Sequence, residues 1–293
     1  VGVRPAIRVN GSLMPLVKKP VLAPEDSEGL ILALLSNFNQ DRLKADKEVD
    51  FSYSFEDKAR FRGNAFYQKG FLSCSLRLIP PQVKDLKSLN LPETMLQHFA
   101  SKEQGFFLAV GPIGHGKSTT LASMIDFINH TRSEHILTIE DPIEYLFIQD
   151  KSIIEQREVF FDTTSFYRAL RSMFREDVNV AMIGEMRDPE TISTAITAAE
   201  TGHLILSSLH TNSASQTVNR IIDSFPPVQQ NQIRVQLSSS LLGIFSQRLL
   251  PRVSGGLIPA YELLINNIAV SNLIREGRSY EIDTVIETSL DQG

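Results

Sequence analysis

The stretch that most constrains the fold is GPIGHGKSTT, residues Gly111 to Thr120, because this glycine-rich turn separates two elements of different type. The run FFLAV, Phe106 to Val110, precedes it and predicts a short, buried parallel strand. The residues TTLASMIDFINH follow it and predict a helix. The turn therefore joins the carboxyl end of a strand to the front of a helix.

The spacing within this turn fits G-x-x-x-x-G-K-[ST], the Walker A loop that wraps nucleotide phosphates. Glycines let successive backbone N–H groups converge on an anion, and the following helix adds its positive N-terminal dipole. Lys117 would neutralise phosphate charge, Ser118 would offer a hydroxyl to Mg²⁺, and His115 occupies a variable position. The predicted nucleotide-binding residues are Gly111, Pro112, Ile113, Gly114, His115, Gly116, Lys117, Ser118 and Thr119.

Length and composition indicate a globular chain of two domains, since 293 residues with 42% hydrophobic side chains can fill two cores. The formal charge of −5 argues against a surface that coats nucleic acid. Cys74 is the one cysteine, which excludes an internal disulfide and a four-cysteine zinc site and fits a reducing cytosol. No apolar run approaches the ~20 residues that span a bilayer, and no leader is expected.

The first 90 residues predict an α+β domain. Two short strands surround Asn10-Gly11, a dipeptide suited to a two-residue hairpin turn, and a helix from Pro24-Glu25 carries apolar residues as far as Phe38. A strand meander follows, with one apolar face on each strand: Phe51, Tyr53 and Phe55, then Leu72, Cys74, Leu76 and Leu78. The prolines and polar residues from Pro80-Pro81 to Pro92 predict a junction, and we place the boundary near residue 90.

Residues 91–293 predict an α/β domain, because from Gly105 strands and helices alternate in the way typical of a parallel sheet. HILTIED, VNVAMIGE and HLILSSLH are the second, third and fourth expected strands. One helix is expected with Phe166, Leu170, Met173 and Phe174 on one face, and another with Asp188 as N-cap and Gly202 at its end. After the fourth strand the chain is expected to be mainly helical.

Polar side chains follow three of these strands, at the sheet edge where ligands of open parallel sheets gather. Glu185 ends an apolar run in the Walker B arrangement, in which a carboxylate reaches Mg²⁺ directly or through water. Glu144, after the second strand, is the candidate base that polarises water, although a solvated loop acid would look the same. Glu140 and Asp141 are left open between metal support and helix capping.

Two histidines and two arginines complete the candidates. His203 and His210 lie on opposite faces of one strand, so they cannot share one metal ion, and packed core histidines are the alternative for both. Arg62 and Arg77 belong to the first domain and are remote from the loop in sequence. The alternative is that both arginines simply lie on an exposed strand face. A role at the phosphates depends on an assembly that brings them to the loop.

With these residues in view, the chain resembles the secretion-superfamily motor ATPases, most closely the PilT-type retraction ATPases of type IV pili. The similarity runs from about Val3 to Tyr280. Its motifs are GPIGHGKSTTLASMID, ILTIEDPIEY, QREV, IGEMRDPETI, AAETGHL and LHTNSA. Each motif alone is weak, and together they are specific.

The resemblance implies a PAS-like first domain, a RecA-like second domain, and a homohexameric ring that uses ATP and Mg²⁺. It implies that Glu144 activates water, that Glu185 is the Walker B acid, and that His203 and His210 form the His box. Arg62 and Arg77 would approach the phosphates. The ring would be cytoplasmic, peripheral at the inner face of the membrane, with an inner-membrane pilus platform protein as partner.

Two departures from the family pattern are present: Val178-Asn179 where proline and aspartate are usual, and Ser271 where an arginine is usual. Pilus retraction is the leading interpretation, and an extension or type II secretion ATPase is the nearest alternative. Many of those enzymes carry a four-cysteine zinc insertion, which one cysteine cannot supply. The acidic composition disfavours a RecA-like DNA translocase, and the full set of acids disfavours a non-hydrolysing switch.

Overall fold

The computed structural model describes residues 2–9, 12–56, 58–79 and 82–289. The chain divides into two compact units, Val1–Pro81 and Gln82–Gly293, which are described separately. The turn expected at Asn10-Gly11 and the Pro80-Pro81 junction lie outside the described residues.

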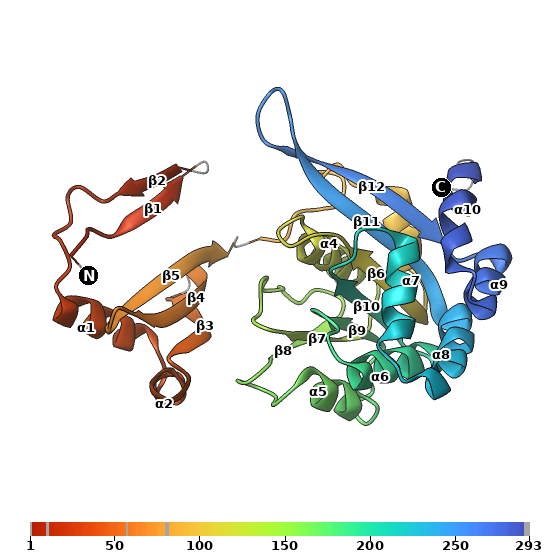
Figure 1. Cartoon of the computed structure of the whole chain (residues 1–293), viewed down its shortest axis with the longest axis horizontal. Coiled ribbons are helices and arrows are strands. Elements are labelled where there is room, and N and C mark those ends of the chain that lie inside the picture. The colour runs from red at the N-terminus through yellow and green to blue at the C-terminus, as the bar shows by residue number, and fades with distance from the viewer. Residues whose placement is uncertain (1, 10–11, 57, 80–81, 290–293) are drawn as a thin grey trace. The chain divides into compact units, whose positions relative to one another are not determined.

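The smaller unit packs two helices against an antiparallel meander, and carries a separate two-stranded ribbon (Figure 1). Its elements are β1 (Ala6–Val9), β2 (Ser12–Pro15), α1 (Pro24–Leu34), α2 (Asn37–Asp46), β3 (Glu48–Phe55), β4 (Ala59–Gln68) and β5 (Phe71–Ile79). Alternation along β3 buries Val49 and Phe51, which pack with Leu43 and Leu72. The alternation fades toward the strand end, where Phe55 is exposed.

The single helix expected to reach Phe38 is in fact two. Leu35 is extended, and the hydroxyl of Ser36 accepts a hydrogen bond from the N–H of Asn39 at 3.3 Å, which starts α2. Serine at an N-cap satisfies a helix donor that would otherwise lack a partner. Phe38 therefore lies in the first turn of a new helix, exposed to solvent.

The larger unit is built on a seven-stranded sheet in the order β12-β11-β6-β10-β9-β7-β8, parallel except for β12. This confirms the expected α/β class. The strands are β6 (Gly105–Val110), β7 (His135–Glu140), β8 (Ile153–Glu158), β9 (Val180–Ile183), β10 (Leu204–Leu209), β11 (Leu241–Pro251) and β12 (Leu257–Ile265). The helices are α3 (Glu93–Ala100), α4 (Lys117–Thr131), α5 (Phe166–Met173), α6 (Pro189–Glu200), α7 (Ala214–Asp223), α8 (Pro227–Ser240), α9 (Ile268–Glu276) and α10 (Ile282–Thr288), with the 3₁₀ turn η1 (Ser279–Glu281).

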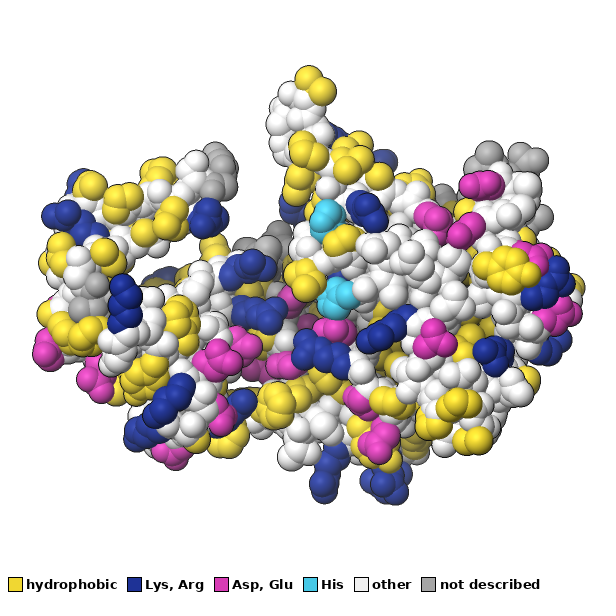
Figure 2. Space-filling model, in the orientation of Figure 1, with side chains coloured by type: hydrophobic (Ala, Val, Ile, Leu, Met, Phe, Trp, Pro, Cys, Tyr) yellow, Lys and Arg dark blue, Asp and Glu magenta, His cyan; other side chains and the backbone are white. Residues whose placement is uncertain are grey.

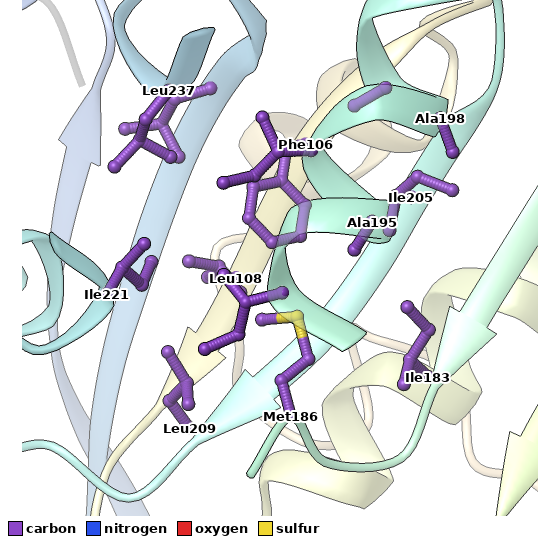
Figure 3. Packing of buried hydrophobic residues seen from close by; sticks show 14 of the residues in the cluster. Phe106, Leu108, Ile183, Met186, Ala195, Ala198, Ile205, Leu209, Ile221 and Leu237 are labelled. Carbon is purple, nitrogen blue, oxygen red and sulfur yellow. The ribbon is translucent and has the colours of Figure 1, made fainter. Parts of the chain in front are cut away.

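Alternating residues of the central strands divide between two cores. On β6, Phe106 and Leu108 face a cluster formed with α5 to α10, and Phe107 and Ala109 face a cluster formed with α3 and α4. Figure 3 shows the first cluster, with Ile205 and Leu209 of β10 beside Phe106 and Leu108. The sheet is therefore covered on both faces, as a parallel sheet requires.

The part of the chain after β10 is mainly helical, as expected, but it also contains two strands that the sequence did not predict. Strands β11 and β12 form a long antiparallel ribbon that continues the sheet beyond β6 (Figure 1). Residues Leu241–Pro251 read LLGIFSQRLLP, and an apolar run of this kind is ambiguous between strand and helix. A second difference is Phe174, which caps α5 and is 42% exposed rather than part of its buried face.

The division between the units falls nine residues before the boundary expected at 90. Leu86 and Leu91 are buried with Leu96 of α3, and the carbonyl of Lys84 accepts a hydrogen bond of 2.6 Å from Ser123 of α4. Residues 82–90 thus pack with the larger unit.

The visible face of each unit in Figure 2 mixes acidic, basic and apolar side chains. Apolar side chains are exposed at the end of the β11–β12 ribbon, where Leu250 and Val253 lie. Among the described residues, no helix has both the length and the apolar character needed to cross a membrane.

Candidate active site

The glycine-rich loop joins β6 to α4 as expected, and its geometry demands glycine. Gly111 has φ of +142°, and a Cβ there would lie 2.2 Å from the carbonyl oxygen of Gln247. Gly116, with φ of +86°, is the N-cap of α4. A side chain at Gly111 would collide with neighbouring backbone, so β11 forms the rear wall of the loop. The first turn of α4, with Ser118 exposed, begins directly after it.

Gln247 of β11 also ties the loop together through its side chain. Its amide oxygen accepts a hydrogen bond of 2.7 Å from the hydroxyl of Thr120, and its amide nitrogen donates to the carbonyl of His115 at 2.7 Å. The ring Nδ1 of His115 accepts from the N–H of Leu249 at 2.9 Å. His115, expected only to fill a variable position, therefore anchors the loop to β11.

Lys117 is buried at the start of α4 and points back into the loop. Its ammonium donates to the carbonyls of Gly111 and Pro112, both at 2.9 Å, and to Nδ1 of His210 at 3.0 Å. Burial lowers the pKa of Lys117, and the carboxylates of Glu185 and Glu144 oppose that shift. The ammonium charge of Lys117 thus lies inside the loop, against the carbonyls of Gly111 and Pro112.

A line of polar contacts runs from Lys117 through His210 to Glu185. Lysine has only donors, so Nδ1 of His210 accepts and its Nε2 carries the proton, 3.3 Å from Oε1 of Glu185. The other oxygen of Glu185 accepts from Arg187 at 2.8 Å. Partial burial raises the pKa of the Glu185 carboxyl, but Arg187 and His210 outweigh that effect and lower it. Glu185 is therefore ionised at neutral pH.

Glu144 lies in the segment that follows β7. Its neighbour Tyr145 shares a hydrogen bond of 2.8 Å with the hydroxyl of Thr119 in the first turn of α4. The Glu144 carboxylate also acts on the pKa of Lys117 through its charge. The structure thereby brings the ends of β6, β7, β9 and β10 together at one edge of the sheet.

The donor set at this edge fits Mg²⁺. This ion prefers oxygen ligands, and proteins hold it with one or two carboxylates while phosphate oxygens and water supply the rest. Ser118 and Glu185 offer a hydroxyl and an ionised carboxylate. Both oxygens of Glu185 already have partners, which favours contact with the ion through water. Among the described residues, no group of three or more His, Cys, Asp or Glu side chains is placed to hold a metal ion.

His203 is not brought to the loop. It precedes β10, and its Nδ1 lies 3.1 Å from the carbonyl of Ala198 while its ring packs edge-on against Phe174. His210 follows the same strand, so the two histidines are separated by its whole length, about 20 Å. Within one chain, the contacts of His203 are thus with Ala198 and Phe174, and its assignment to the His box stays a prediction.

Arg62 and Arg77 are directly opposite each other in the register of β4 and β5. Both belong to the smaller unit, and Arg77 is exposed. The register therefore places two basic residues side by side at one point of this sheet.

Several residues of this site were not predicted from sequence. Gln247 and Thr120 are buried polar residues. The one sequence feature that could have indicated Gln247 is a glutamine within the largely apolar run Leu241–Pro251. Gln156 of β8 belongs to the QREV motif, and its amide donates to the carbonyl of Tyr145 at 2.7 Å. Arg187, with Arg220, lines a pocket of about 380 Å³ that Glu185 and His210 also line.

Comparison with known proteins agrees with this geometry. A family profile described as "Type II/IV secretion system protein" matches residues 7–256. A twitching motility protein of Neisseria gonorrhoeae is 44% identical over 290 residues, which cover 99% of this chain and 77% of the relative. The type IV pilus retraction ATPase PilT of Pseudomonas aeruginosa is 41% identical over 287 residues, 98% of this chain and 83% of the relative.

A solved structure of the pilus retraction motor PilT with bound ADP superimposes with a TM-score of 0.92. It is 48% identical in sequence, and the match covers 98% of this chain and 83% of that one. Fold, motifs and overall similarity thus agree over nearly the whole chain. The chain belongs to the type II/IV secretion system protein family and is a homologue of the PilT pilus retraction ATPases.

Proposed function

We propose that this protein hydrolyses ATP with Mg²⁺ and uses the energy to retract type IV pili. The observation that carries the proposal is the line of contacts from Lys117 through His210 to Glu185, beside the segment that bears Glu144. A phosphate-binding loop alone binds nucleotide, and hydrolysis also needs charge stabilisation and a positioned water. This edge of the sheet offers groups for all three tasks.

Each residue then has a distinct task. Lys117 and the loop N–H groups hold the phosphates, and Lys117 leaves the carbonyls of Gly111 and Pro112 to do so. Glu144 orients the attacking water and accepts its proton. His210 contacts both Lys117 and Glu185, so it senses whether the lysine is engaged with phosphate. Ser118 and Glu185 would hold Mg²⁺, which supplies charge neutralisation at the phosphates when bound.

The motor is proposed to work as a homohexameric ring at the cytoplasmic face of the inner membrane, acting on a pilus platform protein there. Arg62 and Arg77, which are opposite each other in the register of β4 and β5, would supply positive charge to the phosphates. The high identity to retraction ATPases over nearly the whole chain favours retraction over extension or type II secretion. Restoration of twitching in cells that lack their native retraction motor tests this direction.

Two substitutions test the chemistry. Lys117→Ala should abolish ATP binding or turnover, because the loop loses its phosphate-neutralising charge. Glu144→Gln should keep nucleotide affinity and lose about 10²- to 10⁴-fold in kcat, which is what general base catalysis contributes. Steady-state ATPase rates and equilibrium binding of a fluorescent ATP analogue measure both effects. Turnover of Lys117→Ala within twofold of the unaltered protein would place the active site elsewhere.

A further inference from the structure

The segment that carries Glu144 belongs to no helix or strand, yet side chains satisfy its backbone. The N–H of Ile143 donates to the Glu158 carboxylate at 3.2 Å, and the N–H of Phe147 donates to Gln156 at 3.1 Å. The carbonyl of Tyr145 accepts from Gln156. The N–H of Glu144 itself donates to Oε2 of Glu140 at 3.1 Å. Position and conformation here depend on side chains of the sheet, since no regular pattern of backbone bonds sets them.

Glu140 is held as firmly as the segment it binds. It is the last residue of β7, its backbone carbonyl accepts from the N–H of Val159, and its side chain is buried. Oε1 accepts from the hydroxyl of Thr138 at 2.8 Å and from Gln156 at 3.4 Å. Three donors therefore surround one carboxylate, which leaves its orientation little freedom.

We propose that Glu140 is the positioning residue for Glu144 in ATP hydrolysis. The proposal rests on the water-activating role assigned to Glu144 above. Glu140 touches neither the loop nor Lys117 in the contacts of its side chain, and it acts through the N–H of the residue that carries the base. A shift of about 1 Å in a reacting group can lower a rate by about 100-fold. Loss of the hydrogen bond from Glu144 to Glu140 can therefore lower the rate of turnover.

Glutamine cannot reproduce this arrangement although it has the same shape. One carboxylate oxygen becomes an amide nitrogen, which brings two further donors into a place where N–H of Glu144, Thr138 and Gln156 already donate. The amide nitrogen must face either Glu144 or the other pair. With the nitrogen toward Glu144, the bond that restrains Glu144 is lost. With the nitrogen toward Thr138 and Gln156, the bonds that fix the side chain at position 140 are disturbed instead. In either orientation the variant Glu140→Gln weakens the support of Glu144 with minimal change of volume.

The test measures kcat, KM and ATP-analogue affinity for Glu140→Gln, Glu144→Gln and the double variant in the full chain, with single-turnover rates for the slow forms. The assays are run at about pH 8.5, where Glu140, with a pKa of about 7, is ionised and only accepts hydrogen bonds. We expect Glu140→Gln to lower kcat about 10- to 100-fold with affinity within about twofold. In the Glu144→Gln background the same change should have no further effect, because the group it positions is gone. Glu155→Gln, an exposed carboxylate on β8, is the matched control and should keep the normal rate.

The outcomes separate this inference from the proposed function. An active Glu144→Gln would remove the base and with it the reason for a positioning residue. If Glu144→Gln is inactive while Glu140→Gln turns over normally, the role of Glu140 is refuted and that of Glu144 stands. An equal loss from Glu140→Gln in both backgrounds would also refute the inference, because it would show a general structural effect.

Discussion

Replacing Glu140 by glutamine should change how the free energy of unfolding depends on pH. Burial raises the pKa of the Glu140 carboxyl from 4.5 to about 7, and its hydrogen bonds from Glu144, Thr138 and Gln156 only partly offset this. The charge of the Glu144 carboxylate adds to the rise. Between these two pH values the folded protein holds a proton that the unfolded chain has released.

The sign and size of the effect follow from this difference in bound protons. Where the folded state binds more protons than the unfolded state, the free energy of unfolding falls as pH rises. Below the unfolded pKa both states are protonated and the effect is absent, and above about pH 7 it is complete. At about 1.4 kcal/mol per pKa unit, the ionised Glu140 costs the folded protein about 3 kcal/mol.

Glutamine does not titrate, so the comparison isolates this term. The free energy of unfolding of Glu140→Gln minus that of the unaltered protein should increase by about 2 to 3 kcal/mol between about pH 5 and about pH 8. Any constant effect of the amide cancels in this difference. Urea unfolding followed by circular dichroism provides the values, and Glu155→Gln controls for the loss of a surface charge. A change below about 0.5 kcal/mol would show that Glu140 titrates as an ordinary exposed carboxyl.

Three further predictions concern other parts of the chain. Gln247→Leu takes the donor away from the carbonyl of His115 and leaves the Thr120 hydroxyl only its longer bond to the carbonyl of Gly116. It should therefore lower the free energy of unfolding by about 1 to 3 kcal/mol and weaken ATP-analogue binding, and an unchanged melting temperature would contradict this. Arg62→Ala and Arg77→Ala should each keep melting temperature and ring assembly while lowering ATPase rates about 10²- to 10³-fold, and near-normal turnover in both would return them to an exposed strand face. With a net charge of −5, binding of duplex DNA at physiological salt should be weak in a fluorescence anisotropy titration, and tight, salt-steep binding would favour a translocase.

The sequence predicted those parts of the site that follow from local spacing. The loop, Glu185 and His210 come directly after apolar strand runs, and parallel strands bring such ends to one edge. Gln247 was out of reach, because it contacts His115 across 132 residues and no local pattern encodes that pairing. The apolar residues around it fit strand or helix equally well, and only the neighbouring β6 decides between them.

The boundary between α1 and α2 was also not predictable from apolar spacing. The break between α1 and α2 depends on one hydroxyl, that of Ser36, which outweighs the apolar spacing that continues to Phe38. The role of Glu140 was left open because its sequence position fits a cap, a metal site or a buried support equally well. Its hydrogen-bond donors are Thr138 and Glu144, two and four residues away, and Gln156 of the neighbouring strand β8. No sequence pattern indicates that these three meet at one carboxylate, so the structure was needed to choose.

The order of the seven-stranded sheet limits how copies of this unit can associate. Among the described residues of this unit, the two outer strands β12 and β8 each pair with a single strand, and such edges invite further strands. On β12, Pro259 has no N–H to donate, and β8 carries the charged Glu155 and Arg157; proline and charge on an edge strand disfavour edge-to-edge pairing. These features disfavour growth of the sheet from one copy to the next. In the proposed ring, the units would then be joined through side-chain surfaces, which can slide or separate during a cycle of work without breaking a continuous sheet.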